Sequence, residues 1–200
     1  MTRPPEPQDQ LAFAQRVITL LEKLGIRYAI GGSVAAMAYS VQRFTADVDL
    51  MLIAEAEELA RLVDEVNAQQ IYIAPLEAIL EEDIPHGLPF NIYDGAAGTK
   101  ADLFVVPSTG LSGSAMSRRR RIRDEQLGIE GWFLAPEDVI LYKLHYFRQS
   151  QGAAPKHPGD ITKMLAVVGD QLDLAYIEKW AAEIGVADLW DALWDEFQKK

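Results

Sequence analysis

The 200-residue sequence contains no cysteine and no long apolar run. Without cysteine, disulfides and thiolate metal sites are excluded, and a reducing compartment fits well. No stretch of about 18 apolar residues is free of charge, so we expect no transmembrane helix. The first ten residues, MTRPPEPQDQ, lack the apolar core of a signal peptide. We therefore expect a soluble, cytoplasmic protein with no membrane contact, in which residues 1–10 form a disordered leader.

Basic residues are also scarce, because 19 Lys and Arg stand against 30 Asp and Glu for a net charge of −11. Such a surface repels long nucleic acids, since phosphate binding needs cations. The exception is RRRRIR, from Arg118 to Arg123, and without its five arginines the rest of the chain carries −16. Two interpretations stay open. The arginines clamp a triphosphate or a tRNA-like acceptor stem, or they lie on a solvated loop or strand edge and pair with the acidic surface.

Several common functional motifs are missing. The chain has neither a G-x-x-x-x-G-K-[ST] P-loop nor a G-x-G-x-x-G segment, so P-loop and Rossmann nucleotide sites have no support. The three histidines, His86, His145 and His157, are too far apart in sequence to indicate a zinc site. Any metal or nucleotide site must therefore be built differently.

Hydrophobic periodicity indicates an α/β fold with a small mixed sheet and flanking helices, followed by a helical C-terminal region. We expect an α/β domain over residues 11–135 and helices over 136–200. Strands are expected within 26–30 and 46–53, a β-hairpin over 90–106, and a loop over the small, polar residues 108–117. A helix over 11–25 would end at Gly25, and Ser33 could cap the next helix.

Two aspartates interrupt the apolar strand segment ADVDLMLI. Residues i and i+2 of a strand point to the same face, so Asp47 and Asp49 project side by side. Two neighbouring carboxylates raise each other's pKa unless a cation lies between them, and oxygen-only ligands suit Mg²⁺ or Mn²⁺. The simpler alternative is a strand end at which both side chains reach solvent.

Three further features favour a metal and a nucleotide. Gly31, Gly32 and Ser33 lie between a strand and a helix, where backbone can approach phosphate closely, although a plain turn has the same composition. Asp102 comes early in another apolar strand, and three carboxylates on adjacent strands can hold two divalent ions for phosphoryl transfer. Arg43 could orient the carboxylates, meet a phosphate, or form an ordinary salt bridge.

The pattern G-G-S, a short helix, R-x-T-x-D-x-D and a later single Asp resembles the nucleotidyltransferase superfamily, which shares its fold with DNA polymerase β. The segments that carry the resemblance are GGSVAAMAYSVQRFTADVDLML and KADLFVV. More narrowly, these segments and FLAPEDVILYKLHYFRQSQGAAPKHPGDITKML resemble the bacterial minimal nucleotidyltransferases, some of which serve in toxin–antitoxin systems. The resemblance covers roughly residues 25–170.

The resemblance implies roles for individual residues. Asp47 and Asp49 match the two metal-binding aspartates, and Asp102 matches the third carboxylate, which helps to deprotonate the attacking hydroxyl. Gly32 and Ser33 match the G-S element that holds the nucleoside triphosphate.

Gly31, Arg43 and Lys143 are expected to assist nucleotide binding. Lys143 and Asp160 match a helical lysine and aspartate of the toxin-like branch. His157 stands where an Asp often precedes the D-I pair, which is a departure from that branch.

The leading hypothesis is therefore Mg²⁺-dependent (or Mn²⁺-dependent) transfer of an NMP from an NTP to an acceptor, which is an RNA stem end, a protein or a small molecule. A toxin–antitoxin or phage-defence setting would add a small partner protein encoded nearby. One alternative is a non-catalytic member of the fold that acts as a binding or antitoxin-type partner. Another is a small-molecule adenylyltransferase of the antibiotic-modifying kind, whose acidic cleft would suit a cationic substrate.

Overall fold

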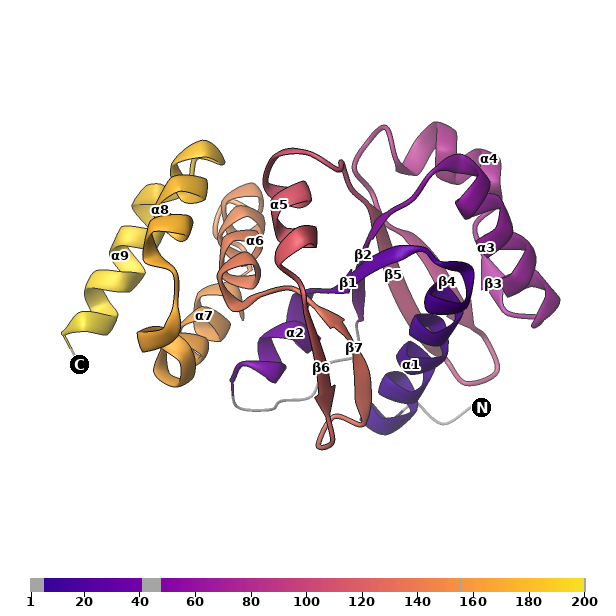
Figure 1. Cartoon of the computed structure of the whole chain (residues 1–200), viewed down its shortest axis with the longest axis horizontal. Coiled ribbons are helices and arrows are strands. Elements are labelled where there is room, and N and C mark those ends of the chain that lie inside the picture. Colours follow the sequence, from indigo (N-terminus) through magenta and orange to yellow (C-terminus); the bar gives the residue numbers. More distant parts are fainter. Residues whose placement is uncertain (1–5, 41–47, 155, 200) are drawn as a thin grey trace. The chain divides into compact units, whose positions relative to one another are not determined.

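The computed structural model describes residues 6–40, 48–154 and 156–199. They form α-helices, β-strands, a π-helix (η1) and a 3₁₀-helix (η2) (Figure 1). In chain order the elements are α1 (Pro7–Leu24), β1 (Arg27–Ile30), α2 (Gly32–Ala38), β2 (Asp49–Ile53), α3 (Ala56–Ala68), β3 (Tyr72–Ile73), α4 (Leu76–Ala78), η1 (Ile79–Asp83), β4 (Phe90–Asp94), β5 (Thr99–Val105), α5 (Gly110–Arg118), β6 (Arg120–Asp124), β7 (Ile129–Phe133), α6 (Pro136–Gln149), α7 (Lys156–Val168), η2 (Gly169–Gln171), α8 (Leu174–Glu183) and α9 (Ala187–Gln198).

The seven strands form one mixed sheet in the order β3-β4-β5-β2-β1-β7-β6. Strands β2 and β5 run parallel, whereas β1 and β2 run antiparallel. The predicted hairpin is confirmed, since β4 and β5 pair antiparallel across a turn that ends at Gly98. The expected mixed sheet with flanking helices is thus confirmed, and its central strands β1 and β2 are almost wholly buried.

The first helix shows how the sequence sets a local boundary. Helix α1 ends where predicted, because Gly25 takes up a left-handed conformation with φ 73° and its N–H donates to the carbonyls of Leu21 and Glu22. It begins at Pro7, earlier than predicted, since proline suits a first helical turn. Its buried side chains, which include Ile18 and Leu21, pack on the sheet.

The loop expected over residues 108–117 is wrong, and the structure of the arginine run agrees with one of its two interpretations. The segment expected to be a loop contains helix α5, which Ala115 and Met116 anchor by being buried despite the low helix propensity of its glycines and serines. The arginine run is itself largely a strand, β6, at the edge of the sheet. Edge strands tolerate charge because one side stays open to solvent, so β6 is the strand edge that one interpretation of the run expected.

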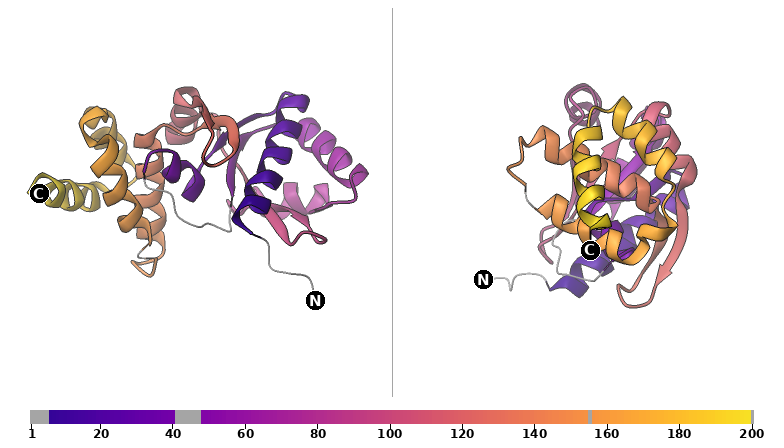
Figure 2. Two further views of the ribbon diagram at one scale, coloured as in Figure 1. Left: turned by 90° about the horizontal axis from the view of Figure 1, so that it is seen from below. Right: turned by 90° about the vertical axis from the view of Figure 1, so that its left-hand side faces the viewer.

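The chain divides into two compact units, residues 1–34 with 44–133 and residues 35–43 with 134–200. The first contains the sheet and helices α1, α3, α4 and α5. The second contains the C-terminal helices, drawn from orange to yellow in Figure 2, where α6 packs on α7 and α8 and α7 packs on α9. Among the described residues we find no helix that combines the length and apolar character of a membrane span.

Candidate active site on strands β2 and β5

Two of the three predicted carboxylates lie on neighbouring strands. Asp49 opens β2 and is in register with Asp102 on the parallel strand β5, whose backbone N–H donates to the carbonyl of Val48 at 2.9 Å. Adjacent strands lie about 4.8 Å apart and side chains in register share a face of the sheet, so both carboxylates project together. The side chain of Asp102 is 14% exposed. The expectation that Asp102 lies in a strand is therefore confirmed, and that strand is adjacent to the strand of Asp49.

Gly32 packs directly against the carboxylate of Asp49. Its φ of +56° lies in the left-handed region, and a Cβ at this position would lie 1.7 Å from Oδ2 of Asp49 and 2.6 Å from Cγ. The preceding glycine, Gly31, donates its N–H to the carbonyl oxygen of Asp49 at 2.9 Å. Both the conformation and the close approach require glycine at position 32, which gives the diglycine a physical reason.

Ser33 is the second residue of α2, because that helix begins at Gly32. The role of helix cap that we predicted for Ser33 is therefore wrong, since a capping residue precedes the first helical turn. Its side chain is 9% exposed. The glycine pair and Ser33 nevertheless follow β1 immediately, and Gly31 and Gly32 contact Asp49.

Lys100 is a site residue that sequence reasoning missed. Its Nζ lies 3.1 Å from Oδ2 and 3.3 Å from Oδ1 of Asp102, two residues along β5 on the same face. Its backbone is held by Gln10, whose buried side chain accepts the Lys100 N–H at 3.2 Å and donates to the Lys100 carbonyl. The spacing K-x-D in a strand carried the signal, because residues i and i+2 share a face.

Asp47 and Arg43, the other two predicted residues of this site, lie outside the described residues. Within residues 6–40, 48–154 and 156–199, no group of three or more His, Asp or Glu side chains is placed to hold a metal ion. The two described carboxylates still fit a hard divalent cation. They are partly buried, in register and oxygen-only.

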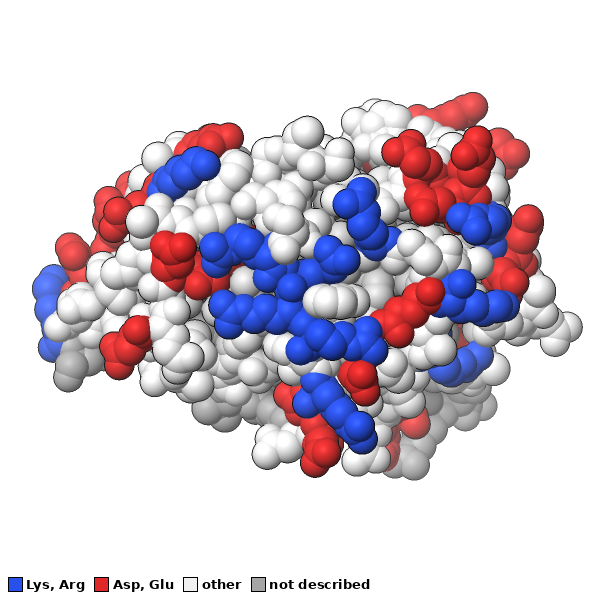
Figure 3. Space-filling view, in the orientation of Figure 1, with Lys and Arg blue, Asp and Glu red and all other residues white. Residues whose placement is uncertain are grey.

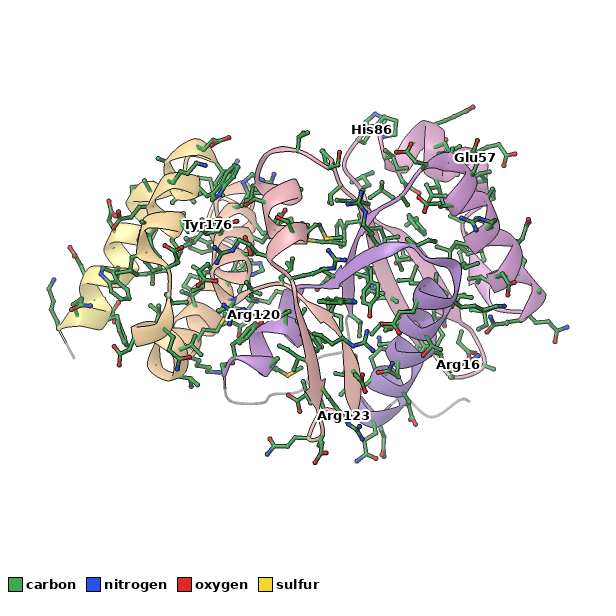
Figure 4. All side chains as sticks on the ribbon, in the orientation of Figure 1. Arg16, Glu57, His86, Arg120, Arg123 and Tyr176 are labelled. Atoms are coloured by element: carbon green, nitrogen blue, oxygen red, sulfur yellow. The ribbon has the colours of Figure 1, made fainter. Side chains whose placement is uncertain are left out.

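Lys143 belongs to the second unit, where it forms a buried ion pair. Its Nζ lies 2.8 Å from Oδ2 of Asp160, and the two residues are 3% and 6% exposed. Nearby, the hydroxyl of Tyr176 (labelled in Figure 4) donates to Oδ1 of Asp138 at 2.6 Å, and Oε1 of Glu137 accepts the N–H of Asp173. These contacts tie the middle of α6 to α7 and its start to α8 and the residue before it. The nucleotide-binding role assigned to Lys143 stays a prediction.

No protein-family model and no curated protein matches this sequence. Solved structures do match it. The solution structure of the antibiotic-resistance factor ANT(2'')-Ia has a TM-score of 0.60 at 14% identity, over 98% of this chain and 100% of that chain. An antigenic nucleotidyltransferase-like protein from Paracoccidioides brasiliensis has a TM-score of 0.56 at 18% identity, over 96% and 94%. The lincosamide antibiotic adenylyltransferase LnuA has a TM-score of 0.55 at 10% identity, over 82% and 99%.

The fold is that of the nucleotidyltransferases. The nucleotidyltransferase-type fold expected from the G-G-S and D-x-D segments is thus confirmed. The match spans nearly the whole chain, the C-terminal helices included. At these identities the similarity shows the fold alone, so the narrower likeness to toxin–antitoxin nucleotidyltransferases stays a prediction.

Proposed function

We propose that this protein is a metal-dependent nucleotidyltransferase that moves an NMP from an NTP to an acceptor hydroxyl. The observation that carries the proposal is the register of Asp49 with Asp102, together with the contact of Gly32 on the Asp49 carboxylate. The carboxylate pair supplies anionic ligands for a cation, and the glycine turn beside it supplies backbone that a phosphate can approach. Both are needed where a nucleoside triphosphate is bound and cleaved.

Asp49 and Asp102, together with Asp47, are the residues that would hold Mg²⁺ or Mn²⁺. The ion would neutralise charge on the triphosphate and lower the pKa of the acceptor hydroxyl. The chain's own residues do the positioning. Gly31, Gly32 and Ser33 present backbone to the triphosphate, and the Lys100 ammonium offsets the charge of Asp102 from 3.1 Å.

The proposed reaction is an in-line displacement at the α-phosphorus. The acceptor oxygen forms a bond to this phosphorus, and its proton passes to the carboxylate of Asp102. The bond from the α-phosphorus to the bridging oxygen breaks, and its electron pair leaves with pyrophosphate. Few protein groups are needed, because catalysis of phosphoryl transfer rests mostly on positioning and charge stabilisation.

The acceptor is the open part of this proposal. ANT(2'')-Ia is an antibiotic-resistance factor, and one of its structures contains adenylyl-2''-tobramycin, so a small cationic molecule belongs among the candidates. The resemblance to the bacterial minimal nucleotidyltransferases adds RNA and protein acceptors, in a cytoplasmic toxin–antitoxin or phage-defence system with a small partner protein. Assays should therefore include each acceptor class.

Two experiments test the proposal. The first is a binding titration of the protein with each NTP, with and without Mg²⁺. The second measures transfer of α-labelled NMP to an aminoglycoside, to RNA and to the protein itself. We expect one NTP to bind only with the metal, and Asp49→Asn to abolish both binding and transfer. The matched control is Asp64→Asn, which removes the same charge from an exposed position on α3.

Equal NTP binding by wild type and Asp49→Asn would contradict the assignment of the site. Failure of every NTP to bind the wild type would overturn the enzyme hypothesis. It would favour the alternative, a non-catalytic binding partner that retains the fold.

A further inference from the structure

Strand β6 carries the highest concentration of positive charge on the molecule. Arg119, Arg120, Arg121 and Arg123 belong to it or precede it directly, and Arg27 on β1 lies close enough to affect the pKa of Arg119. We call these five residues the basic strip. Figure 3 shows basic side chains gathered in a band over the β6–β7 hairpin, and Figure 4 places Arg120 and Arg123 along β6. The strip contrasts with the net charge of −11 of the whole chain.

Carboxylates near the strip have partners already. Arg121 bonds to Glu22 on α1, and its Nη2 lies 3.0 Å from Oε1 of Glu130. Asp124 accepts the backbone N–H groups of the hairpin turn at 2.9 and 3.0 Å. Glu22 and Glu130 therefore neutralise Arg121, and Asp124 shapes the turn. Within the described residues, none of the three forms an ion pair with another arginine of the strip.

Three guanidinium groups of the strip form no ion pair with the described part of the chain. In the part of the chain that the structure describes, Arg27, Arg120 and Arg123 have no carboxylate within 4.0 Å, and all three are exposed. Burial and the neighbouring charge of Arg27 lower the pKa of Arg119, which shows that like charges are crowded here. Such crowding costs free energy unless an anion compensates it.

Trp132 holds part of the strip in place. The guanidinium of Arg119 lies 4.9 Å from the centre of the Trp132 ring, and that of Arg121 lies 6.0 Å from it. Cation–π contacts restrict long, flexible side chains, so less entropy is lost when the guanidinium groups bind a ligand. The strip is thus partly preorganised.

We propose that the basic strip binds the phosphate backbone of a nucleic acid without regard to base sequence. Guanidinium groups match phosphate geometry with paired hydrogen bonds, and a flat sheet edge lets a chain of phosphates contact several of them. The acidic remainder of the surface repels the same ligand, so contact is confined to the strip. With Arg27, Arg120 and Arg123 as the free cations, about three phosphates are engaged.

One end of the strip, at Arg120, lies at the end of the sheet that carries Asp49, whereas Arg27 pairs with Ile53 at the other end of β2 and Arg123 pairs with Glu130 at the other end of β7. Pairing runs from Leu50 on β2 through Ile30 and Phe133 to Arg120 on β6, one residue beyond the row of Asp49. Three strand spacings separate β2 from β6, which is roughly 14 Å. Delivery of a bound strand to the carboxylates as an acceptor would rest on the proposed function, whereas docking on the strip does not.

Fluorescence anisotropy of the full chain with labelled 12-nucleotide RNA and DNA strands and a duplex, without NTP or metal, tests the proposal. For single strands, a plot of the logarithm of the association constant against the logarithm of the salt concentration should have a slope of about −2. Each phosphate contact contributes about −0.7 to this slope. Arg120→Ala/Arg123→Ala should lower affinity about tenfold and reduce the slope to about −0.7. Arg61→Ala/Lys163→Ala is the control, because it removes the same charge from exposed positions elsewhere.

Loss of affinity in the strip variant alone supports the proposal, and the RNA, DNA and duplex arms then identify the ligand. Equal effects of the two double variants would overturn it, as would an absence of binding by the wild type at low salt. A polyglutamate of equal charge that binds as tightly would also overturn it, in favour of an acidic protein partner. NMP transfer is measured separately. A strip that binds no nucleic acid would therefore leave the proposed function untouched, and an absence of NMP transfer would leave the binding proposal untouched.

Discussion

Replacement of Gly32 by alanine probes the contact that organises the candidate site. The new Cβ would lie 1.7 Å from Oδ2 of Asp49, far inside van der Waals contact, in a residue held at φ +56°. Left-handed backbone costs an L-residue about 1–2 kcal/mol, and overpacking adds about 1–3 kcal/mol. We therefore expect Gly32→Ala to lower the free energy of unfolding by about 2–5 kcal/mol and to abolish NTP binding.

Two controls separate backbone strain from steric conflict. Gly87 has a φ of +65° with no atom within 4 Å of an added Cβ, so Gly87→Ala should cost only the backbone part, about 1–2 kcal/mol. Asp49→Ala removes the Oδ2 and Cγ atoms that the new Cβ would meet. The double variant Gly32→Ala/Asp49→Ala should therefore be more stable than additivity predicts by about 1–3 kcal/mol.

Urea denaturation followed by far-UV circular dichroism measures all four variants. Two results would contradict the predicted steric conflict with Asp49. One is a loss of unfolding free energy in Gly32→Ala no larger than that in Gly87→Ala. The other is additivity of the changes at positions 32 and 49 within about 0.5 kcal/mol. Either result would mean that the position of the Asp49 carboxylate does not require a residue without a side chain at position 32.

Two further predictions concern other parts of the chain. Lys143→Met leaves the buried carboxylate of Asp160 without its cation and should destabilise the protein by about 3–5 kcal/mol. The double variant Lys143→Met/Asp160→Leu should recover part of this stability in the same urea assay. No recovery would show that loss of the ion pair is not the cause of the destabilisation. Burial and the hydrogen bond to Glu22 raise the pKa of Tyr28 above its ordinary value of 10.0. Above pH 10 the unfolded chain therefore loses a proton that the folded chain keeps, so stability should fall with pH by up to about 1.4 kcal/mol per unit. Tyr28→Phe should remove this part of the decline, and equal slopes for both proteins would contradict it.

Local signals in the sequence were sufficient for much of the fold. The end of α1 at Gly25, the β4–β5 hairpin and a strand within 46–53 follow from glycine position and apolar periodicity. Helix α5 escaped these rules, and strand β6 was only one of two interpretations of the arginine run. The first is poor in strong helix formers and the second is almost wholly charged, so burial on one side and an exposed sheet edge outweigh local preference.

The sequence by itself determined the residue types of the candidate site: carboxylates in strands, glycines at a turn and a cluster of arginines. Only the tertiary structure decided which of them meet. The parallel pairing of β2 and β5 brings Asp49 and Asp102 into register across more than 50 residues of chain, and the turn before α2 places Gly32 on the Asp49 carboxylate. The position of Arg120 at this end of the sheet also depends on strand register. Register depends on the burial of whole strand faces, which no single motif encodes.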